Sequence, residues 1–358
     1  MGIRCETEFT AGVPSTRPNA PVASEAMSQP ARHRRRSSAP LALVLALVVG
    51  VVGAVGVIRA ANARTSDIER IEGLELALTP QDGPARNYLL IGSDSREGAD
   101  PNAVDFGGIG DVNEVTGRRS DTIMVLRQEA DGNGASIVSL PRDLWVDVVG
   151  FGPNRINSAY SQGTDVLATT ITQQLGIPIH HVVDIDFNGF KELVDVVGGT
   201  TVCFLYPTRD KNTGLDQQPG CHVLDGIESL QYARSRYYEE FRDGQWRTDP
   251  TSDLGRIERQ QEFLQQTADG TIDKLQSDPF LASELIGAGT AAMRMDPGLD
   301  PVAAAGTLRK AFGTGLNKYQ LPVSGVTRNG NAVLVLDPGA EPILDYFRGL
   351  GPPPAVES

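Results

Sequence analysis

The chain has 358 residues, 22% of them charged, and a formal net charge of −13 at pH 7. Residues 1–39 hold six arginines and three glutamates, and the apolar run after them holds no charge, so residues 59–358 carry −16. This balance argues against nucleic acid as a partner, because binding to a phosphate backbone requires a net basic face.

The N-terminal part predicts a membrane anchor. Residues 1–39 are rich in Pro, Ser, Ala and Arg and lack hydrophobic periodicity, which is typical of a disordered tail, and Met27 is an alternative start. The run Leu41–Ile58 is uncharged and long enough to cross a bilayer, so we expect a transmembrane helix over residues 40–58. The arginines directly before it predict that the tail is cytoplasmic and that the rest of this single-pass protein lies outside the cytoplasm.

A cleaved signal peptide is the rival interpretation, since Ala61-Asn62-Ala63 resembles a small-residue cleavage site. We favour the uncleaved anchor because the apolar region of a signal is shorter and Arg59 would stand between that region and the cut. The rest of the chain is then expected to divide into a juxtamembrane linker over 59–85, one extracytoplasmic domain over 86–350 and a flexible tail over 351–358.

Hydrophobic patterning within this domain predicts strands interleaved with helices. Strands are expected at Asn87–Ile91, Thr122–Leu126, Ser136–Leu140, Trp145–Val149 (as an edge strand), Val182–Phe187, Thr200–Phe204 and Val333–Leu336. Helices are expected at Ser158–Leu175, Gly189–Val197, Leu224–Ala233 and Leu254–Lys274, with two more between Pro279 and Leu316. The second and third strands are joined by Asp131-Gly132-Asn133-Gly134, a strong signal for an antiparallel hairpin. The order predicts an α/β fold, a mixed central β-sheet with helices on both faces.

The cysteines predict one disulfide. Cys203 and Cys221 lie in the part expected outside the cytoplasm, where disulfides persist, and a bond between them would close a polar loop. A metal site is the alternative, but with only His222 nearby the two cysteines fall short of four ligands. Cys5 lies in the tail and is expected to be an inert free thiol.

Two carboxylates stand at the ends of predicted strands. Asp94 follows the strand Asn87–Ile91, and Asp121 opens the strand Thr122–Leu126. If these strands are antiparallel neighbours, both carboxylates meet at one edge of the sheet, where they could hold Mg²⁺. Taken singly, either Asp is better explained as a solvated cap of a turn or a strand.

Arginines gather near the same edge. Arg142 follows the second strand of the hairpin, and Arg119 stands two residues before Asp121. Arg234 and Arg236 share a face only if the chain is extended, and we expect it to uncoil there from the end of a helix. On an ordinary surface such arginines simply face solvent.

One helix face adds further polar groups. Asp253, Arg256 and Gln260 stand at i, i+3 and i+7 in the first turns of a predicted helix, whose N-terminus favours anions. The plainer alternative is an exposed Asp–Arg pair. Guanidinium groups grip phosphate oxygens in pairs, so carboxylates and arginines together indicate a site for a metal-bound pyrophosphate. Arg118 and Arg259 lie beside these positions and are expected to be ordinary surface residues.

These motifs resemble a known family. The segments NYLLIGSDSRE, RRSDTIMVL, SLPRDLWV, RINSAY, LDGIESLQYARSRY and DLGRIERQQEFL are similar, in order, to the motifs of the LytR–CpsA–Psr family. The resemblance runs from about Asn87 to Gln266 and departs from many relatives in a long Gly-rich insert over Ala99–Gly117.

The resemblance implies a cell-envelope phosphotransferase that moves a glycopolymer from a polyprenyl-pyrophosphate carrier to the 6-hydroxyl of peptidoglycan muramic acid. It implies that Asp94 and Asp121 bind Mg²⁺ and that Asp253 orients an arginine. It also implies a set of pyrophosphate ligands, namely Arg119, Arg142, Arg234, Arg236, Arg256 and Gln260, with Arg142 and Arg236 counted as catalytic together with the two metal-binding aspartates.

Two other functions stay open at this point. Hydrolysis of the polyprenyl pyrophosphate would use the same charges, because water would replace the sugar hydroxyl. A non-catalytic envelope regulator is less favoured, since the basic tail is too short and unpatterned for a DNA-binding fold. The general base, the polymer transferred and the residues that contact the lipid tail are not specified by the sequence.

Overall fold

The structure, a computed structural model, describes residues 68–93, 120–131, 134–249, 253–277, 293–301, 303–304 and 315–355. These residues all belong to one unit of the chain, residues 53–358. Among them no helix is both long and apolar enough to cross a bilayer; the run Leu41–Ile58 lies outside the described residues.

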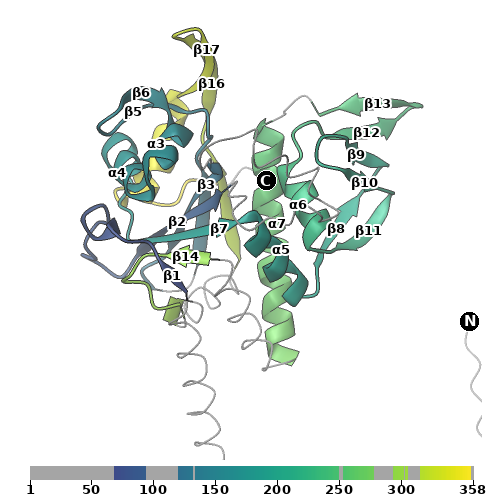
Figure 1. Cartoon of the computed structure of the whole chain (residues 1–358), viewed down its shortest axis with the longest axis horizontal. Coiled ribbons are helices and arrows are strands. Elements are labelled where there is room, and N and C mark those ends of the chain that lie inside the picture. Colours follow the sequence, from purple (N-terminus) through teal and green to yellow (C-terminus); the bar gives the residue numbers. More distant parts are fainter. Residues whose placement is uncertain are drawn as a thin grey trace, which may run out of the picture. The chain divides into compact units, whose positions relative to one another are not determined.

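A mixed sheet forms the centre of this unit (Figure 1). In spatial order its strands are β1 (Glu69–Arg70), β14 (Met293–Met295), β7 (His181–Asp186), β2 (Arg86–Ser93), β3 (Ser120–Gln128), β4 (Ala135–Ser139) and β15 (Leu316–Gln320). The antiparallel pairs are β2 with β3, β3 with β4 and β7 with β14, whereas β2 runs parallel to β7 and β4 runs parallel to β15. The predicted mixed central sheet and its β3–β4 hairpin are confirmed.

The alternating side chains of β3 divide the core between the two faces of the sheet. Ile123 and Val125 pack into one cluster, and Met124 and Leu126 pack into the other. The helices that bury the first face are α3 (Ile156–Gln162), α4 (Thr164–Leu175) and α10 (Glu341–Arg348). The helices on the other side are α5 (Phe187–Val196), α6 (Gly226–Arg234) and α7 (Asp253–Ser277). Both faces are therefore covered, as an α/β sheet with apolar strands requires.

Beyond α7 lies a set of short strands that the sequence predicted only in part (Figure 1). One pair is β8 (Thr200–Phe204) with β11 (Gly220–Leu224), and a separate sheet holds β9 (Thr208–Asp210), β10 (Leu215–Gln217), β12 (Glu239–Arg242) and β13 (Gln245–Thr248). Cys203 and Cys221 are register partners in the first pair and are joined by a disulfide, as predicted. The polar loop expected between them is the β9–β10 hairpin.

Several boundaries differ from the sequence prediction. The expected helix Ser158–Leu175 is two helices, because Gly163 at φ +157° interrupts it. The expected edge strand is β5 (Trp145–Val148), and it pairs with β6 (Gly152–Arg155) outside the central sheet. The final strand, β17 (Asn331–Leu336), likewise lies outside the central sheet: it pairs with β16 (Val323–Arg328), and its Leu334 forms an isolated bridge with Leu144.

The ends of the predicted domain also need correction. Part of the expected linker folds onto the domain: β1 joins the central sheet, and Leu74 in the 3₁₀-helix η1 (Leu74–Leu76) is fully buried in its core. A second 3₁₀-helix, η2 (Pro338–Ala340), precedes α10. In the expected C-terminal tail, the carbonyl of Pro354 accepts a hydrogen bond from Tyr319. In the stretch 279–316, expected to hold two helices, the described residues include the strand β14, and most of the stretch lies outside the described residues.

Candidate active site

The sheet edge predicted to carry the two carboxylates exists. Ser93, the last residue of β2, pairs with Ser120, the first residue of β3, while Gly92 pairs with Thr122. Asp121 is therefore the extra residue of a β-bulge, a feature that re-aims side chains beside many active sites. The side chain of Asp121 is not described, and Asp94 and Arg119 lie outside the described residues.

Arg142 emerges from β4 next to this edge. Its guanidinium lies 3.5 Å from the Asp143 carboxylate, which also pairs with Arg155 at 3.3 Å. The Arg142 carbonyl accepts the N–H of Asn157 at the start of α3. Backbone and side chain are thus both tied to neighbouring elements, so the chain that presents Arg142 is anchored.

The predicted face of α7 is buried. Arg256 is only 2% exposed, and Gln260 donates a hydrogen bond to the carbonyl of Ala233 near the end of α6 at 2.9 Å. Arg142, Arg256 and Gln260 line one small cavity together with Thr122 and Ser139. The structure therefore brings together residues that are more than a hundred positions apart in the sequence. The helix begins at Asp253, whose side chain is not described.

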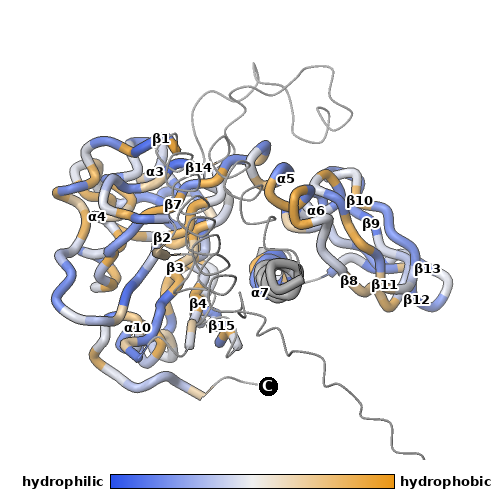
Figure 2. Tube along the Cα trace, turned by 90° about the horizontal axis from the view of Figure 1, so that it is seen from below, coloured by the Kyte–Doolittle hydropathy of each residue, from blue (hydrophilic) through white to orange (hydrophobic). Residues whose placement is uncertain are grey.

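A larger apolar cavity of about 320 Å³ adjoins this small one. Thr122, Met124 and Gln260 line both cavities. The apolar cavity lies between the second face of the sheet and α5, α6 and α7, and its lining is mostly hydrophobic, including Leu90, Leu193, Val194, Leu230 and Phe263. Figure 2 shows the hydrophobic stretches of α5 and α6 and of the central strands that contribute to it.

Close packing of α5 against α6 shapes this cavity. The backbone N–H of Gly226 donates to Asp195 at 2.7 Å, and a Cβ at Gly226 would lie 2.4 Å from the Lys191 carbonyl oxygen. Only glycine allows this approach at the start of α6. Asp225 caps the helix: its carboxylate accepts a hydrogen bond from the Glu228 N–H, and the Glu228 carboxylate accepts one from the Asp225 N–H.

The predicted uncoiling at the end of α6 is confirmed from Ser235 onward, whereas Arg234, expected to be uncoiled, is the last residue of the helix. The helix ends at Arg234, and Ser235 is extended, with φ −60° and ψ 124°. Arg234 lines the apolar cavity and lies over the Phe187 ring, with its guanidinium carbon 4.3 Å from the ring centroid. We call Arg234–Arg236 the arginine segment.

Sequence reasoning missed the residue that anchors the arginine segment. Asp210, in β9, is fully buried, and its Oδ2 accepts three hydrogen bonds: from the Ser235 hydroxyl at 2.7 Å, the Arg236 N–H at 3.0 Å and the Tyr237 N–H at 2.9 Å. Its Oδ1 accepts the N–H of Asn212 at 2.8 Å. The hairpin closed by the disulfide thus carries the carboxylate that fixes the backbone at Arg236. A lone Asp in a polar loop gave no signal for this role.

Arg259 is a second residue that the sequence misjudged. It was expected on the surface, but it is 8% exposed and donates to the Asp249 carboxylate at 2.9 Å and to the Ser235 carbonyl at 2.7 Å. Its guanidinium also lies over the Tyr238 ring at 4.5 Å. Arg259 therefore ties the arginine segment to α7, in addition to the contacts that Asp210 makes with it.

Asp186 is a further carboxylate at the apolar cavity. It caps α5 by accepting the Gly189 N–H at 2.8 Å. Burial raises the pKa of Asp186 above its usual value, and the hydrogen bond from Gly189 opposes that change. Within the described ranges no group of three or more His, Cys, Asp and Glu side chains is arranged to hold a metal ion.

Comparison with known proteins assigns the chain to a family. A family model described as the LytR_cpsA_psr family matches residues 52–341. The chain belongs to this family. The resemblance drawn from the sequence motifs is therefore confirmed.

The LytR_cpsA_psr relatives are distant. The probable cell wall biosynthesis protein LcpB of Corynebacterium glutamicum is 28% identical over 310 residues, which cover 84% of this chain and 69% of that protein. The regulatory protein MsrR of Staphylococcus aureus is 30% identical over 190 residues, so the alignment covers 51% of this chain and 50% of MsrR.

Solved structures of the family share the fold. A LytR-Csp2A-Psr enzyme from Actinomyces oris superposes with a TM-score of 0.58 at 25% identity and covers 78% of this chain and 94% of that chain. The Bacillus subtilis protein YwtF (TagT), with a bound octaprenyl pyrophosphate lipid, superposes with a TM-score of 0.53 over 79% of this chain and 99% of that chain. At 20% identity the second likeness shows the fold alone.

Proposed function

We propose that this protein is a phosphotransferase of the cell envelope. It would move a glycopolymer from a polyprenyl-pyrophosphate carrier onto the 6-hydroxyl of peptidoglycan muramic acid as a phosphodiester. One observation carries the proposal: the largely apolar cavity has Arg234 and Gln260 in its lining and adjoins a second cavity lined by Arg142 and Arg256. The first offers space to a lipid tail, and the second offers guanidinium groups to a diphosphate.

The relatives support this proposal in two ways. The family member YwtF (TagT), which has the same fold, holds an octaprenyl pyrophosphate lipid, a molecule with one apolar and one anionic part. The relative LcpB is described as a probable cell wall biosynthesis protein. The lipid held by YwtF (TagT) matches the division of the present site into an apolar and a cationic part, and the description of LcpB matches a role in the cell envelope.

Mg²⁺ belongs to the same proposal. Asp94 and Asp121 would supply the hard oxygen ligands that Mg²⁺ prefers, and the bulge at Asp121 turns the chain where β2 ends and β3 begins. When bound, the metal would neutralise charge on phosphate oxygens. The donor chemistry of these two residues fits an ion that takes its other ligands from substrate and water.

In the proposed step, the acceptor oxygen forms a bond to the phosphorus that carries the glycopolymer. The bond from this phosphorus to the bridging oxygen breaks, and polyprenyl phosphate leaves. Arg142, Arg236 and Arg256 would stabilise the charge on the non-bridging oxygens and on the leaving phosphate, because guanidinium groups stay protonated at neutral pH. The proton of the acceptor hydroxyl passes either to a carboxylate of the site or to a substrate phosphate.

The pyrophosphate ligands fall into two groups by origin. Arg142 and Arg256 come from the end of β4 and the first turns of α7, which pack against the central sheet. Arg234 and Arg236 come from the arginine segment, which Asp210 and Arg259 hold. Arg119 would join them from the start of β3, and Asp253 would orient Arg256 or Arg236 as a second-sphere partner.

We also propose that residues 40–58 anchor the protein in the cell membrane with the catalytic domain outside the cytoplasm. A polyprenyl carrier is dissolved in the bilayer, so a domain tethered to the same membrane stays at a high effective concentration near it. The Cys203–Cys221 disulfide supports an oxidising compartment.

The test uses the purified full chain in detergent with Mg²⁺, a polyprenyl-pyrophosphate-linked glycopolymer and peptidoglycan. Mass spectrometry should find a glycopolymer–peptidoglycan phosphodiester, and Arg236→Ala or Asp121→Ala should abolish its formation while the domain stays folded. Full transfer by either variant would overturn the site assignment. Release of free phosphorylated polymer alone would make the protein a polyprenyl-pyrophosphate phosphatase, and absence of any product would leave a regulatory role, as the description of MsrR suggests.

A further inference from the structure

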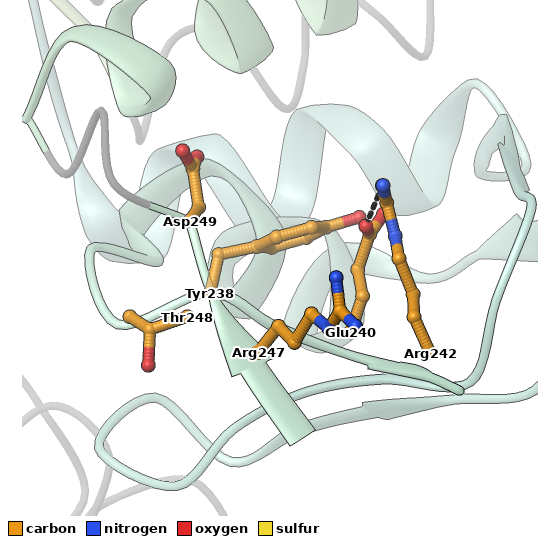
Figure 3. A pocket seen from close by; sticks show the side chains of 6 residues that line it. All are labelled: Tyr238, Glu240, Arg242, Arg247, Thr248 and Asp249. Carbon is orange, nitrogen blue, oxygen red and sulfur yellow. Dashed lines mark hydrogen bonds and ion pairs between the residues drawn. The ribbon is translucent and has the colours of Figure 1, made fainter. Parts of the chain in front are cut away.

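A third cavity, of about 350 Å³, lies on the β12–β13 hairpin, outside the pyrophosphate site. We call it the hairpin pocket; its lining residues are Tyr238, Glu240, Arg242, Arg247, Thr248 and Asp249. Figure 3 shows the Tyr238 ring lying across the pocket, with Glu240, Arg242 and Arg247 gathered toward its hydroxyl end and Asp249 at the other end. Its volume falls within the range of small-molecule sites, roughly 300–1,000 Å³.

The charges of the hairpin pocket balance. Its two arginines are matched by two carboxylates, and Glu240 forms an ion pair with Arg242. The pyrophosphate site, by contrast, collects arginines at one place. A lining with equal numbers of cationic donors and anionic acceptors suits a neutral ligand whose groups both donate and accept hydrogen bonds, and sugar hydroxyls do both.

An aromatic ring adds the second half of a sugar site. Tyr238 lies across the pocket, whereas Phe241 and Trp246, with ring centroids 5.4 Å apart, are register partners that alternate with the lining pair Glu240 and Arg247 and so belong to the other face of the hairpin. The guanidinium of Arg209 lies 3.8 Å from the centroid of Trp246, which fixes this ring. The face of the Tyr238 ring can pack against the apolar C–H face of a pyranose.

The hairpin pocket is connected to the arginine segment by hydrogen bonds. Its residue Asp249 accepts a hydrogen bond from Arg259, and the same guanidinium donates to the carbonyl of Ser235, which lies between Arg234 and Arg236. Two hydrogen bonds through one side chain therefore connect the pocket wall to the segment proposed to hold the diphosphate.

We propose that the hairpin pocket binds a saccharide unit of a glycan substrate, next to the site of phosphoryl transfer. The inference rests on the proposed function for the source of the saccharide, which is either the donor glycopolymer or the peptidoglycan acceptor. Either source presents the same chemistry, a pyranose with neighbouring hydroxyl groups. The pocket thereby gives the enzyme a means of selecting sugars that the arginines lack.

Titration calorimetry provides the readout. The full chain in detergent is titrated with phosphate-free wall polysaccharide in one arm and with peptide-free glycan strands of peptidoglycan in the other. We expect a saturable change in the heat of binding in at least one arm, and the arm that responds identifies the source.

Two variants test the pocket itself. Arg247→Ala and Glu240→Gln should each weaken saccharide binding about tenfold, the effect of losing one hydrogen bond to a charged group. Arg328→Ala, which removes an exposed arginine from β16, should leave binding unchanged. Arg236→Ala should also bind the saccharide normally while failing in transfer, which separates this inference from the proposed function. Absence of a saturable change in both arms, or unweakened binding by both pocket variants, would overturn the proposal.

Discussion

Replacing Asp210 by Asn should disable transfer although Asp210 touches no substrate. The carboxylate is fully buried in β9 and holds the arginine segment through Ser235, Arg236 and Tyr237. Asn keeps one acceptor oxygen but loses the charge. Three charge-assisted hydrogen bonds then become neutral ones, which costs about 1 kcal/mol each.

The second oxygen adds to this cost. The amide nitrogen of Asn would take the place of Oδ1 and face the N–H of Asn212, so two donors would meet where a donor and an acceptor now lie 2.8 Å apart. An unsatisfied buried donor costs about 1–3 kcal/mol, and the total loss at Asp210 is then about 4–6 kcal/mol. Because this energy holds the backbone at Arg236, we expect a displacement that lowers kcat about 100-fold.

The assay compares kcat for polymer transfer, KM for the lipid-linked donor and the thermal midpoint. Ser235→Ala removes one of the three donors and should give an intermediate loss of kcat, so the order is wild type, Ser235→Ala, Asp210→Asn. Asp216→Asn makes the same chemical change at an exposed position of the same hairpin and should have no effect. If Asp210→Asn folded and transferred polymer at the wild-type rate, the positioning role would be refuted.

The disulfide, the apolar cavity and His180 give three further predictions. Replacing Cys203 and Cys221 by Ser should lower the unfolding free energy by about 3 kcal/mol in urea titrations, and an unchanged midpoint would contradict this. Leu193→Trp should occupy the apolar cavity and raise KM for the lipid-linked donor, whereas Val223→Trp on the exposed face of β11 should not. Burial lowers the pKa of His180 from 6.5 to about 4. The unfolded chain therefore takes up this proton first as the pH falls, so stability should decrease between pH 6.5 and pH 4, by about 1–2 kcal/mol for a partly buried group. His180→Gln should flatten that slope.

The central sheet was predictable because its signals are local. Each of β2, β3, β4 and β7 is a short apolar run, and burial on both faces requires such runs. The turn residues between β3 and β4 fixed their antiparallel pairing in the same way. Strand order and the β1 and β14 additions were not predictable, because β1 and β14 have only two or three residues and gain their stability from partners distant in the chain.

The strands beyond α7 escaped prediction for a related reason. β9, β10, β12 and β13 have three or four residues each and are largely polar. Their stability comes from tertiary contacts, such as Arg209 with Glu239 and with Trp246. Helical spacing predicts that Arg256 and Gln260 lie on one face of a helix. No periodicity of the sequence predicts the contact between Asp210 and Ser235, because these residues lie in different elements.

The polar residues of α7 explain how one buried arginine is aimed. Burying a guanidinium or an amide is costly unless its hydrogen bonds are satisfied. Arg259 donates hydrogen bonds to the Asp249 carboxylate and the Ser235 carbonyl, and Gln261 donates to the Ser139 hydroxyl and the Tyr319 carbonyl. These contacts fix α7 against the arginine segment on one side and against β4 and β15 on the other. The rotation of the helix is then determined, and Arg256 is left facing the small cavity that Arg142 also lines. A guanidinium so deeply buried would be stabilised further by an anion in that cavity, as the proposed role of Arg256 requires.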